Sequence, residues 1–527
     1  MQDAFRDGVK WGVLANAAQK LVSFGLNQAL MRCIDISTLG MAAVPLELFL
    51  SSLTFVSREG VRLALLRESI TSRAQLQRFV NLSWVPMAVL TVFMAALSTV
   101  VYFRQSSTNI TTLMYCLAAV LEATGEPWVN LFQNNAQLVP KMQAEAAGLF
   151  VKSVVTFVTV GYLGWGVHGF GIAQISYGLT YLATLASYTS TIVIHHGGQV
   201  REQQQQHLDF AHLLPGRCLQ LPEDDGSSWL DMRPISFAVT ATGSCILKHI
   251  LTEADKIFLS LFRSNYDQGI FAVANNYASL VVRIIFLPIE DASRIAFSQL
   301  SSGGTDKMDG LLVFVQLLRV VGLIGMLFPL FGTSYVHLAV RYLLNEKWQG
   351  IETEHTLKAF CVYIFILSIN GISEAYCQIL VSTAGFTNVN LGLVLSFVVY
   401  VVVSFLLIDY IGTSGVVLAG TAAMVVRIVS SHLIVKASVA ATTSISIVNL
   451  LVPSVTQGVT VALASLLCYA SSLRFAASAE TTISALEHFL VGVAMALFLL
   501  AAHWRQFSEQ IALLLAALKK KNKTKLQ

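Results

Sequence analysis

Apolar runs of about twenty residues recur along almost the whole of this sequence, and they limit it to one kind of fold. Each run is long enough for an α-helix to cross the roughly 30 Å hydrocarbon core of a bilayer. Hydrophobic residues make up 55% of the chain and charged residues only 12%, about half the share in an average soluble domain. We therefore predict an all-α polytopic membrane protein with about fourteen transmembrane helices.

The predicted spans form two groups of about six, followed by two more. The first group lies in 1–194 and the second in 234–437, while the additional helices lie in 438–505. Between the groups, residues 195–233 are rich in Gly, Gln and charge without helical periodicity, which predicts a cytosolic linker between two pseudo-symmetric lobes. Residues 506–527 form a basic tail, which either contacts anionic lipids or acts as a topology signal.

The orientation of the spans follows from the positive residues of the short loops. Lys and Arg gather on one predicted side, roughly twenty against six on the other. Loops rich in positive charge stay in the cytosol, so we expect both termini to be cytosolic.

Residues 251–296, in the second half, contain two apolar runs yet carry several charged residues. Part of this stretch is repeated in the first half. The matching pairs are Asp35 and Asp267, Glu59 and Asp291, Arg62 and Arg294, and Ala64 and Ala296. Each pair has the same spacing of 232 residues (267 − 35, 291 − 59, 294 − 62, 296 − 64). A parallel repeat of this kind predicts a substrate site between two lobes related by an axis along the membrane normal.

Polar side chains follow one helical face in several predicted spans. They are Asn16, Lys20, Ser23 and Asn27 in the first span, Glu122, Glu126, Asn130, Gln133 and Gln137 in the fourth, and Asn370, Glu374 and Gln378 in the tenth. Pro127 is able to kink the fourth span. A single amide of this kind often serves only to tie helices together, but stripes that carry Lys and Glu favour a hydrated interior.

Cations outnumber acids inside the predicted spans, so the interior should attract an anion. The cations are Lys20, Arg58, Arg62, Lys152, Lys248, Arg283, Arg319 and Arg427. Arg suits this task because its guanidinium can bind a phosphate through two parallel hydrogen bonds. We also predict that Lys152 neutralises one of Glu122 and Glu126, since two carboxylates one helical turn apart repel each other.

Several classes of function lack their sequence motif. There is no GxxxxGK[ST] phosphate-binding loop, so ATP is not expected to drive transport, and there is no HExxH or GxSxG. The scattered cysteines do not form a metal-binding pattern. We therefore expect no enzymatic activity, no metal, no cofactor and no nucleic-acid partner.

Five segments resemble the Rft family of eukaryotic endoplasmic-reticulum membrane proteins. They are FVSREGVR at 55–62, GEPWV at 125–129, LTEADK at 251–256, DQGIFAVANNYASLVVRIIFLPIEDA at 267–292 and NGISE at 370–374. The resemblance implies movement of a mannose-rich oligosaccharide-diphosphodolichol from the cytosolic to the lumenal leaflet for protein N-glycosylation. It also implies the two-lobed fold of the superfamily of multidrug extruders and lipid-linked-oligosaccharide flippases.

The resemblance extends to individual positions. Matching motifs imply roles for Arg58, Glu59, Arg62, Arg283, Glu290 and Lys152. Shorter matching segments imply roles for Arg32 and Arg427. We predict that the diphosphate is bound by Arg58, Arg62, Arg283, Lys20, Arg427 and Arg32. We assign structural or gating charges to Glu59, Glu290, Asp291, Lys152, Glu122 and Glu126. We assign sugar binding to Asn16, Asn27, Asn130, Gln133, Asn370 and Glu374.

These patterns favour a flippase for dolichol-linked oligosaccharide without an ATP motor, located in the endoplasmic-reticulum membrane. Its expected partners are the lipid substrate, membrane lipids and proteins of the glycosylation pathway. The alternative is a non-transporting scaffold or lipid-binding accessory protein of that pathway. A cation-coupled exporter of small molecules would need a dedicated acidic coupling site, and the excess of cations in the spans argues against it.

Overall fold

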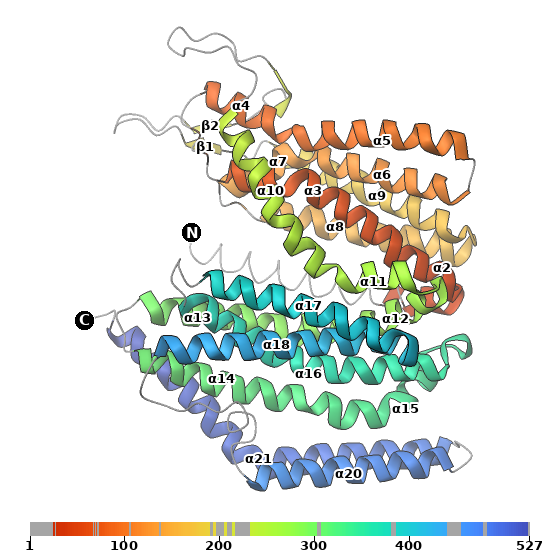
Figure 1. The fold of residues 1–527 in the computed structure, drawn as a ribbon, viewed down its shortest axis with the longest axis vertical. Helices are drawn as coiled ribbons and strands as arrows, with labels where there is room; N and C mark the ends of the chain where they lie inside the picture. Colours follow the sequence, from red (N-terminus) through yellow and green to blue (C-terminus); the bar gives the residue numbers. More distant parts are fainter. Residues whose placement is uncertain are drawn as a thin grey trace. The chain divides into compact units, whose positions relative to one another are not determined.

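The computed structural model describes residues 25–26, 28–66, 68, 70, 73–104, 107–135, 137, 139–189, 193–195, 205–207, 213–216, 232–302, 307–380, 386–439, 455–477 and 482–524. Nearly all of them are helical (Figure 1). A helix satisfies its own backbone hydrogen bonds, which a bilayer cannot do, so apolar sequence of this length is expected to fold this way. The chain divides into two compact units, Met1–Ser260 and Leu261–Gln527.

Besides the helical residues 25–26 and 28–33, the described residues of the first unit form nine α-helices and two short strands. They and two π-helical segments are α2 (Ile36–Met41), η1 (Ala42–Leu46), α3 (Glu47–Leu65), α4 (Arg73–Ser83), α5 (Val85–Arg104), α6 (Ser107–Thr124), α7 (Glu126–Asn134), α8 (Val139–Thr156), η2 (Phe157–Tyr162), α9 (Gly166–Ser187), β1 (Val193–His195), β2 (Gln205–His207) and α10 (Met232–Thr252). The next helix, α11 (Ala254–Phe262), contains the boundary between the units.

The second unit is helical throughout its described residues. Its elements are α12 (Asn265–Val281), η5 (Val282–Phe286), α13 (Leu287–Ser302), α14 (Lys307–Leu327), η6 (Phe328–Gly332), α15 (Thr333–Leu343), η7 (Glu346–Trp348), α16 (Ile351–Leu380), α17 (Phe386–Ile411), α18 (Thr413–Val439), α20 (Val455–Ala477) and α21 (Thr482–Thr524). The long helix α16 packs against α12, α13, α14, α15 and α18, so it lies at the centre of this unit (Figure 1).

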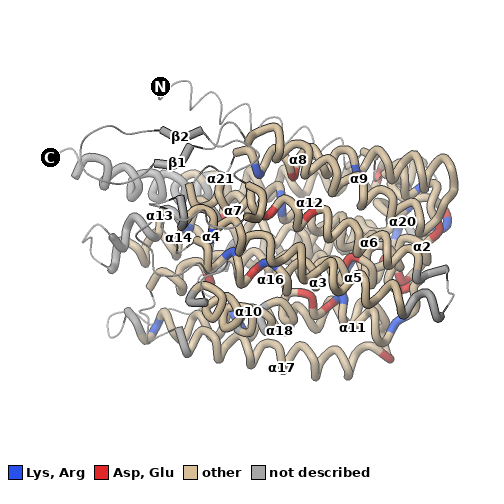
Figure 2. Tube along the Cα trace, turned by 90° about the horizontal axis from the view of Figure 1, so that it is seen from above, with Lys and Arg blue, Asp and Glu red and all other residues tan. Residues whose placement is uncertain are grey.

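Within the described residues, ten helical stretches are long and apolar enough to cross a membrane. Figure 2 shows that most of the length of these helices carries neither acid nor base. The all-helical membrane architecture is therefore confirmed, while the count of about fourteen and the lobe boundaries stay predictions. Helix α10 packs along α3 and belongs by its contacts to the first unit.

The predicted kink in the fourth span is a complete break. Helix α6 ends at Thr124 and α7 begins at Glu126, with Pro127 in its first turn. Proline is accepted there because the amide it lacks would have no partner in a first helical turn anyway. The break allows Glu122 on α6 and Glu126 on α7 to be presented by two separate helices.

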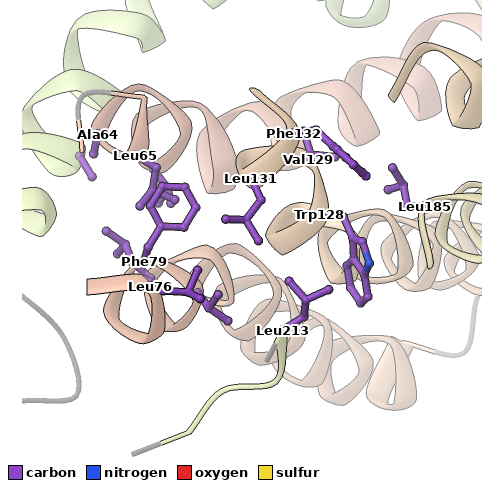
Figure 3. Close-up of a cluster of buried hydrophobic side chains, with 14 of the residues drawn as sticks. Ala64, Leu65, Leu76, Phe79, Trp128, Val129, Leu131, Phe132, Leu185 and Leu213 are labelled. Carbon is purple, nitrogen blue, oxygen red and sulfur yellow. The ribbon is translucent and has the colours of Figure 1, made fainter. Parts of the chain in front are cut away.

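The predicted linker contains more structure than its composition indicates. Strands β1 and β2 pair antiparallel, with Ile194 opposite Gln206. Residues 213–216, here named the linker anchor, pack onto the first unit, and the Leu213 side chain is fully buried. Figure 3 shows Leu213 in a cluster with Leu76, Trp128 and Leu131. Within the predicted linker, this segment is therefore packed against the first unit through one buried leucine.

Candidate functional site

Helix α3 carries two arginines one turn apart, and the inner one forms a complete ion pair. The Arg62 guanidinium donates from Nε to Glu126 Oε2 at 2.8 Å and from Nη2 to Glu126 Oε1 at 2.6 Å. Glu126 is fully buried and the Arg62 side chain is only 13% exposed. This two-bond geometry fixes both side chains and uses one edge of the guanidinium.

Arg58 lies beside the same carboxylates without a short hydrogen bond to either. Its Nη1 is 3.6 Å from Glu122 Oε2 and 3.8 Å from Glu126 Oε1, and its side chain is 26% exposed. The two acids therefore balance the charge of Arg58, while its donors remain able to bind an incoming anion.

The two acids belong to a buried polar stripe that a third helix completes. Gln174 on α9 donates from Nε2 to Glu122 Oε1 at 3.1 Å. Asn130 Nδ2, Gln133 Oε1 and Gln174 Oε1 are buried and have no hydrogen-bond partner among the described residues. Buried amides normally have partners, so the stripe offers donors and acceptors to water or to a ligand hydroxyl. Gln174 was not predicted as a site residue, and a single Gln in an apolar span gives little signal.

Lys152, predicted to neutralise one acid of this pair, makes its ion pair with another residue, although its charge still acts on Glu122. Lys152 Nζ lies 3.9 Å from Glu47 Oε2 at the start of α3. The carboxylates of Glu122 and Glu126 are instead matched by Arg58 and Arg62. The reason is that helix α8, which carries Lys152, packs mainly against α9, whereas α3 faces both α6 and α7.

The second unit contains a continuous polar network across three helices. On α13, Arg294 Nη2 donates to Glu290 Oε1 at 2.6 Å, and Arg294 Nη1 donates to Gln378 Oε1 on α16 at 3.3 Å. Gln378 Nε2 donates to Glu374 Oε1 at 3.1 Å, and Glu374 Oε2 accepts a hydrogen bond from Arg427 on α18. The network joins the predicted residues Glu290, Glu374 and Arg427.

Asn370 and Gly371 complete this network on α16. Asn370 Nδ2 lies 3.4 Å from Glu374 Oε2, and its Oδ1 has no hydrogen-bond partner among the described residues. A Cβ added at Gly371 would lie 2.6 Å from Glu290 Oε2, so the missing side chain lets α13 place its carboxylate against α16.

Two residues of this network, Gln378 and Arg294, were not predicted as site residues, although the sequence pattern contains both. Gln378 is part of the tenth-span stripe, and Arg294 is the counterpart of Arg62 at the spacing of 232 (294 − 62). In each unit, this arginine reaches the polar stripe of the predicted fourth or tenth span, at Glu126 or at Gln378. The two arginines differ in their main partner, since Arg62 pairs with Glu126 on α7 and Arg294 with Glu290 on its own helix.

Arg283 differs from the other arginines of the predicted site. It lies in the π-helical segment η5, its side chain is exposed, and its Nη2 donates to Ser279 Oγ at 3.2 Å. No acid pairs with it within the described part of the chain. Segments of π-helix inside α-helices are frequent at functional sites. Arg283 is thus an exposed cation in a candidate spanning helix, without an acidic partner among the described residues.

The remaining predicted residues lie at the edges of these clusters or outside them. Glu59 is half-buried in the second half of α3, and Arg32 is exposed just before α2. Three predicted residues, Asn16, Lys20 and Asn27, lie outside the described residues, as does the side chain of Asp291. No group of His, Cys, Asp and Glu suited to hold a metal occurs within the residues that were described.

Comparison with known sequences gives one family over almost the whole chain. The model of the family described as "Rft protein" matches residues 5–515. A relative from Dictyostelium discoideum is 24% identical over 438 residues, which is 76% of this chain and 80% of the relative. One from Xenopus tropicalis is 26% identical over 467 residues, 82% of each chain. Both bear the name Man(5)GlcNAc(2)-PP-dolichol translocation protein RFT1.

Comparison with solved structures identifies the fold. The lipid II flippase MurJ, in an inward closed conformation, aligns with a TM-score of 0.57 at 13% identity, over 94% of this chain and 99% of MurJ. An inward-facing multidrug transporter of the MATE family aligns with a TM-score of 0.53 at 12% identity, over 79% of this chain and 94% of the transporter. The chain therefore has the fold that MurJ and MATE transporters share.

Proposed function

Because this chain belongs to the Rft protein family, we propose that it moves a mannose-rich oligosaccharide-diphosphodolichol from the cytosolic to the lumenal leaflet of the endoplasmic reticulum. The printed names of its relatives support this substrate, and the fold shared with a lipid flippase supports the mode of action. Both termini are proposed to be cytosolic, in keeping with the distribution of Lys and Arg in the loops.

The observation that carries the proposal is the accessibility of two arginines in spanning helices. Arg58 has no short bond to its neighbouring acids, and Arg283 has no acidic partner among the described residues. A cation at membrane depth is costly and is retained where it has a function, which here is binding a diphosphate. Lys20 and Arg32 stay proposed as further diphosphate contacts.

The paired arginines have a different proposed role. Arg62 is held by Glu126 and Arg427 by Glu374, so both are positioning residues that keep the polar stripes in place. Sugar hydroxyls would bind to the free amide atoms of Asn130, Gln133 and Asn370. The other proposed sugar contacts are Asn16, Asn27 and Glu374, and the other proposed structural or gating charges are Glu59, Glu122, Glu290, Asp291 and Lys152.

Purified protein in liposomes with a fluorescent oligosaccharide-diphosphodolichol tests the proposal directly. We expect the lipid to equilibrate between leaflets without added nucleotide, because the sequence has no phosphate-binding loop for ATP. If the protein binds the lipid but leaves its leaflet distribution unchanged, the accessory-protein alternative holds instead.

Replacing Arg283 by Gln should slow the transfer of the lipid by about tenfold to a hundredfold. The reason is that a hydrogen bond to a charged group is worth about 1.5–3 kcal/mol. Folding should be unaffected, since Arg283 is exposed and bonds only to Ser279 among the described residues. Arg474→Gln, which changes another exposed arginine of the second unit on α20, is the matched control and should transfer lipid at the wild-type rate. Equal rates for the two variants would remove Arg283 from the site.

A further inference from the structure

The linker anchor, residues 213–216, occupies a recess on the first unit that is built like a binding site for a short peptide. Leu213 is fully buried, whereas the next residue, Leu214, is 44% exposed. Figure 3 shows the Leu213 side chain beside the ring of Trp128 on α7, with Leu76 of α4 on its other side. The recess therefore takes one leucine of the segment and leaves its neighbour outside.

Hydrogen bonds to the backbone hold the linker anchor along its whole length. Trp84 Nε1 donates to the Leu213 carbonyl at 2.8 Å, and Gln77 Nε2 donates to the Leu214 carbonyl at 3.0 Å. Asn81 forms two hydrogen bonds with Gly216. Asn81 Nδ2 donates to the Gly216 carbonyl at 2.9 Å, and the Gly216 amide donates to Asn81 Oδ1 at 3.1 Å. The side chains in these bonds come from α4 and from Trp84, the turn residue between α4 and α5, as a receptor provides contacts to a bound peptide.

The contacts that hold the anchor are few enough for its docking to be reversible. Burial of one leucine and four hydrogen bonds favours the docked state. Ordering four residues costs conformational entropy of the same order. The docked and undocked states are therefore close enough in free energy for the loss of one contact to change which state dominates.

Docking of the anchor also supports the helix that carries Glu126. Trp128, which packs beside Leu213, lies two residues after Glu126 in α7. Its Nε1 donates to Thr189 Oγ1 at 2.8 Å, just after the end of α9. Trp128 is therefore held by this hydrogen bond and by packing in the cluster that contains Leu213. Glu126 in turn holds Arg62 through two hydrogen bonds. A path of direct contacts thus leads from the linker anchor to the arginines of α3.

We propose that the linker anchor is a reversible latch that holds α7, and through it the Arg62–Glu126 pair, in the arrangement described here. When Leu213 leaves its recess, Trp128 loses the packing beside it and α7 becomes free to open locally. The linker then controls the polar cluster of the first unit from outside the spanning helices. This inference concerns the protein alone and does not depend on the proposed substrate.

Hydrogen–deuterium exchange of the full-length protein in detergent micelles tests the latch. In Leu213→Ala, the backbone amides of 129–134 in α7 should exchange at least about tenfold faster than in the wild type, because removing a buried leucine side chain empties the recess. The matched control is Leu214→Ala, which trims the exposed neighbour and keeps its carbonyl, and it should exchange like the wild type. Amides of 170–185 in α9 should be unchanged in both variants.

A second variant separates loss of the latch from general damage to the core. Trp84→Phe keeps most of the ring volume but removes the donor to the Leu213 carbonyl, so it should also raise exchange in 129–134. Acceleration in 129–134 for Leu213→Ala and Trp84→Phe, but not for Leu214→Ala, supports the proposal. Acceleration confined to 213–216, or equal effects of Leu213→Ala and Leu214→Ala, would overturn it.

Discussion

At the scale of single residues, the described charges divide into those that are fully paired and those that are not. Arg62 and Arg427 each bond an acid directly, while Arg58 and Arg283 keep donors available. Paired charges at this depth maintain structure, because removing one member leaves the other buried without a counter-charge, which strongly destabilises the fold. The number of cations in the spans therefore overstates the number that can bind an anion.

Replacing Glu126 by Gln should destabilise the protein by about 3–5 kcal/mol, because it leaves the buried Arg62 without its counter-charge. The measurement is thermal unfolding of the purified protein in detergent. The double variant Arg62→Met with Glu126→Leu removes both charges and should recover most of that stability. A single variant as stable as the wild type would show that the pair has little structural role.

At the scale of elements, α3 and α10 lie in tight contact at Gly60. A Cβ added at Gly60 would collide with Thr242 Oγ1 and with the carbonyl oxygen of Ala238. Farther along the same two helices, His249 Nε2 lies 3.0 Å from Ser52 Oγ and its ring stacks on Phe55. The helix that presents Arg58 and Arg62 is thus held along its length by α10.

Replacing Gly60 by Val should push α3 and α10 apart and cost about 1–3 kcal/mol of stability, as added volume does in a close-packed interface. Gly243 on α10 is the matched control, since a Cβ added there meets nothing within 4 Å. Gly243→Ala should leave stability unchanged or raise it by up to about 1 kcal/mol. Melting temperatures of the two variants check this, and equal losses in both would contradict the close contact at Gly60.

At the scale of the whole molecule, one buried histidine links the last two helices to the rest of the second unit. His488 of α21 donates from Nε2 to the Ser334 carbonyl at 3.1 Å and accepts from Ser471 Oγ of α20 at Nδ1, 2.7 Å away. Tyr335 donates to the His488 carbonyl at 2.7 Å and stacks on its ring. Because three helices meet at this side chain, α20 and α21 are connected to α15 through specific bonds as well as apolar contact.

Replacing His488 by Phe should keep the ring stacking but leave Ser471 and the Ser334 carbonyl without their partner, at a cost of about 1–3 kcal/mol. Limited proteolysis within α20 and α21 should accelerate in this variant. His355→Phe, which changes an exposed histidine on α16, should behave as the wild type. Unaltered stability and cleavage in His488→Phe would show that apolar packing alone holds the last two helices.

The sequence by itself determined the class of the protein and the positions of its polar stripes. A bilayer offers no partners for backbone amides, so long apolar runs can only form helices there, and the positions of these runs are readable directly. Helical periodicity likewise places Asn370, Glu374 and Gln378 on one face. The resemblance carried by short motifs predicted the family, which the family model confirms over residues 5–515.

Only the tertiary structure decided which side chains are partners. Lys152 follows the fourth span in sequence, yet Arg58 and Arg62 reach Glu122 and Glu126, because pairing depends on which helices are neighbours in space. The same holds for Leu213, a single apolar residue in a polar linker, whose burial depends on a recess formed by α4 and α7. Periodicity describes one helix at a time, whereas contacts between helices follow from how all of them pack together.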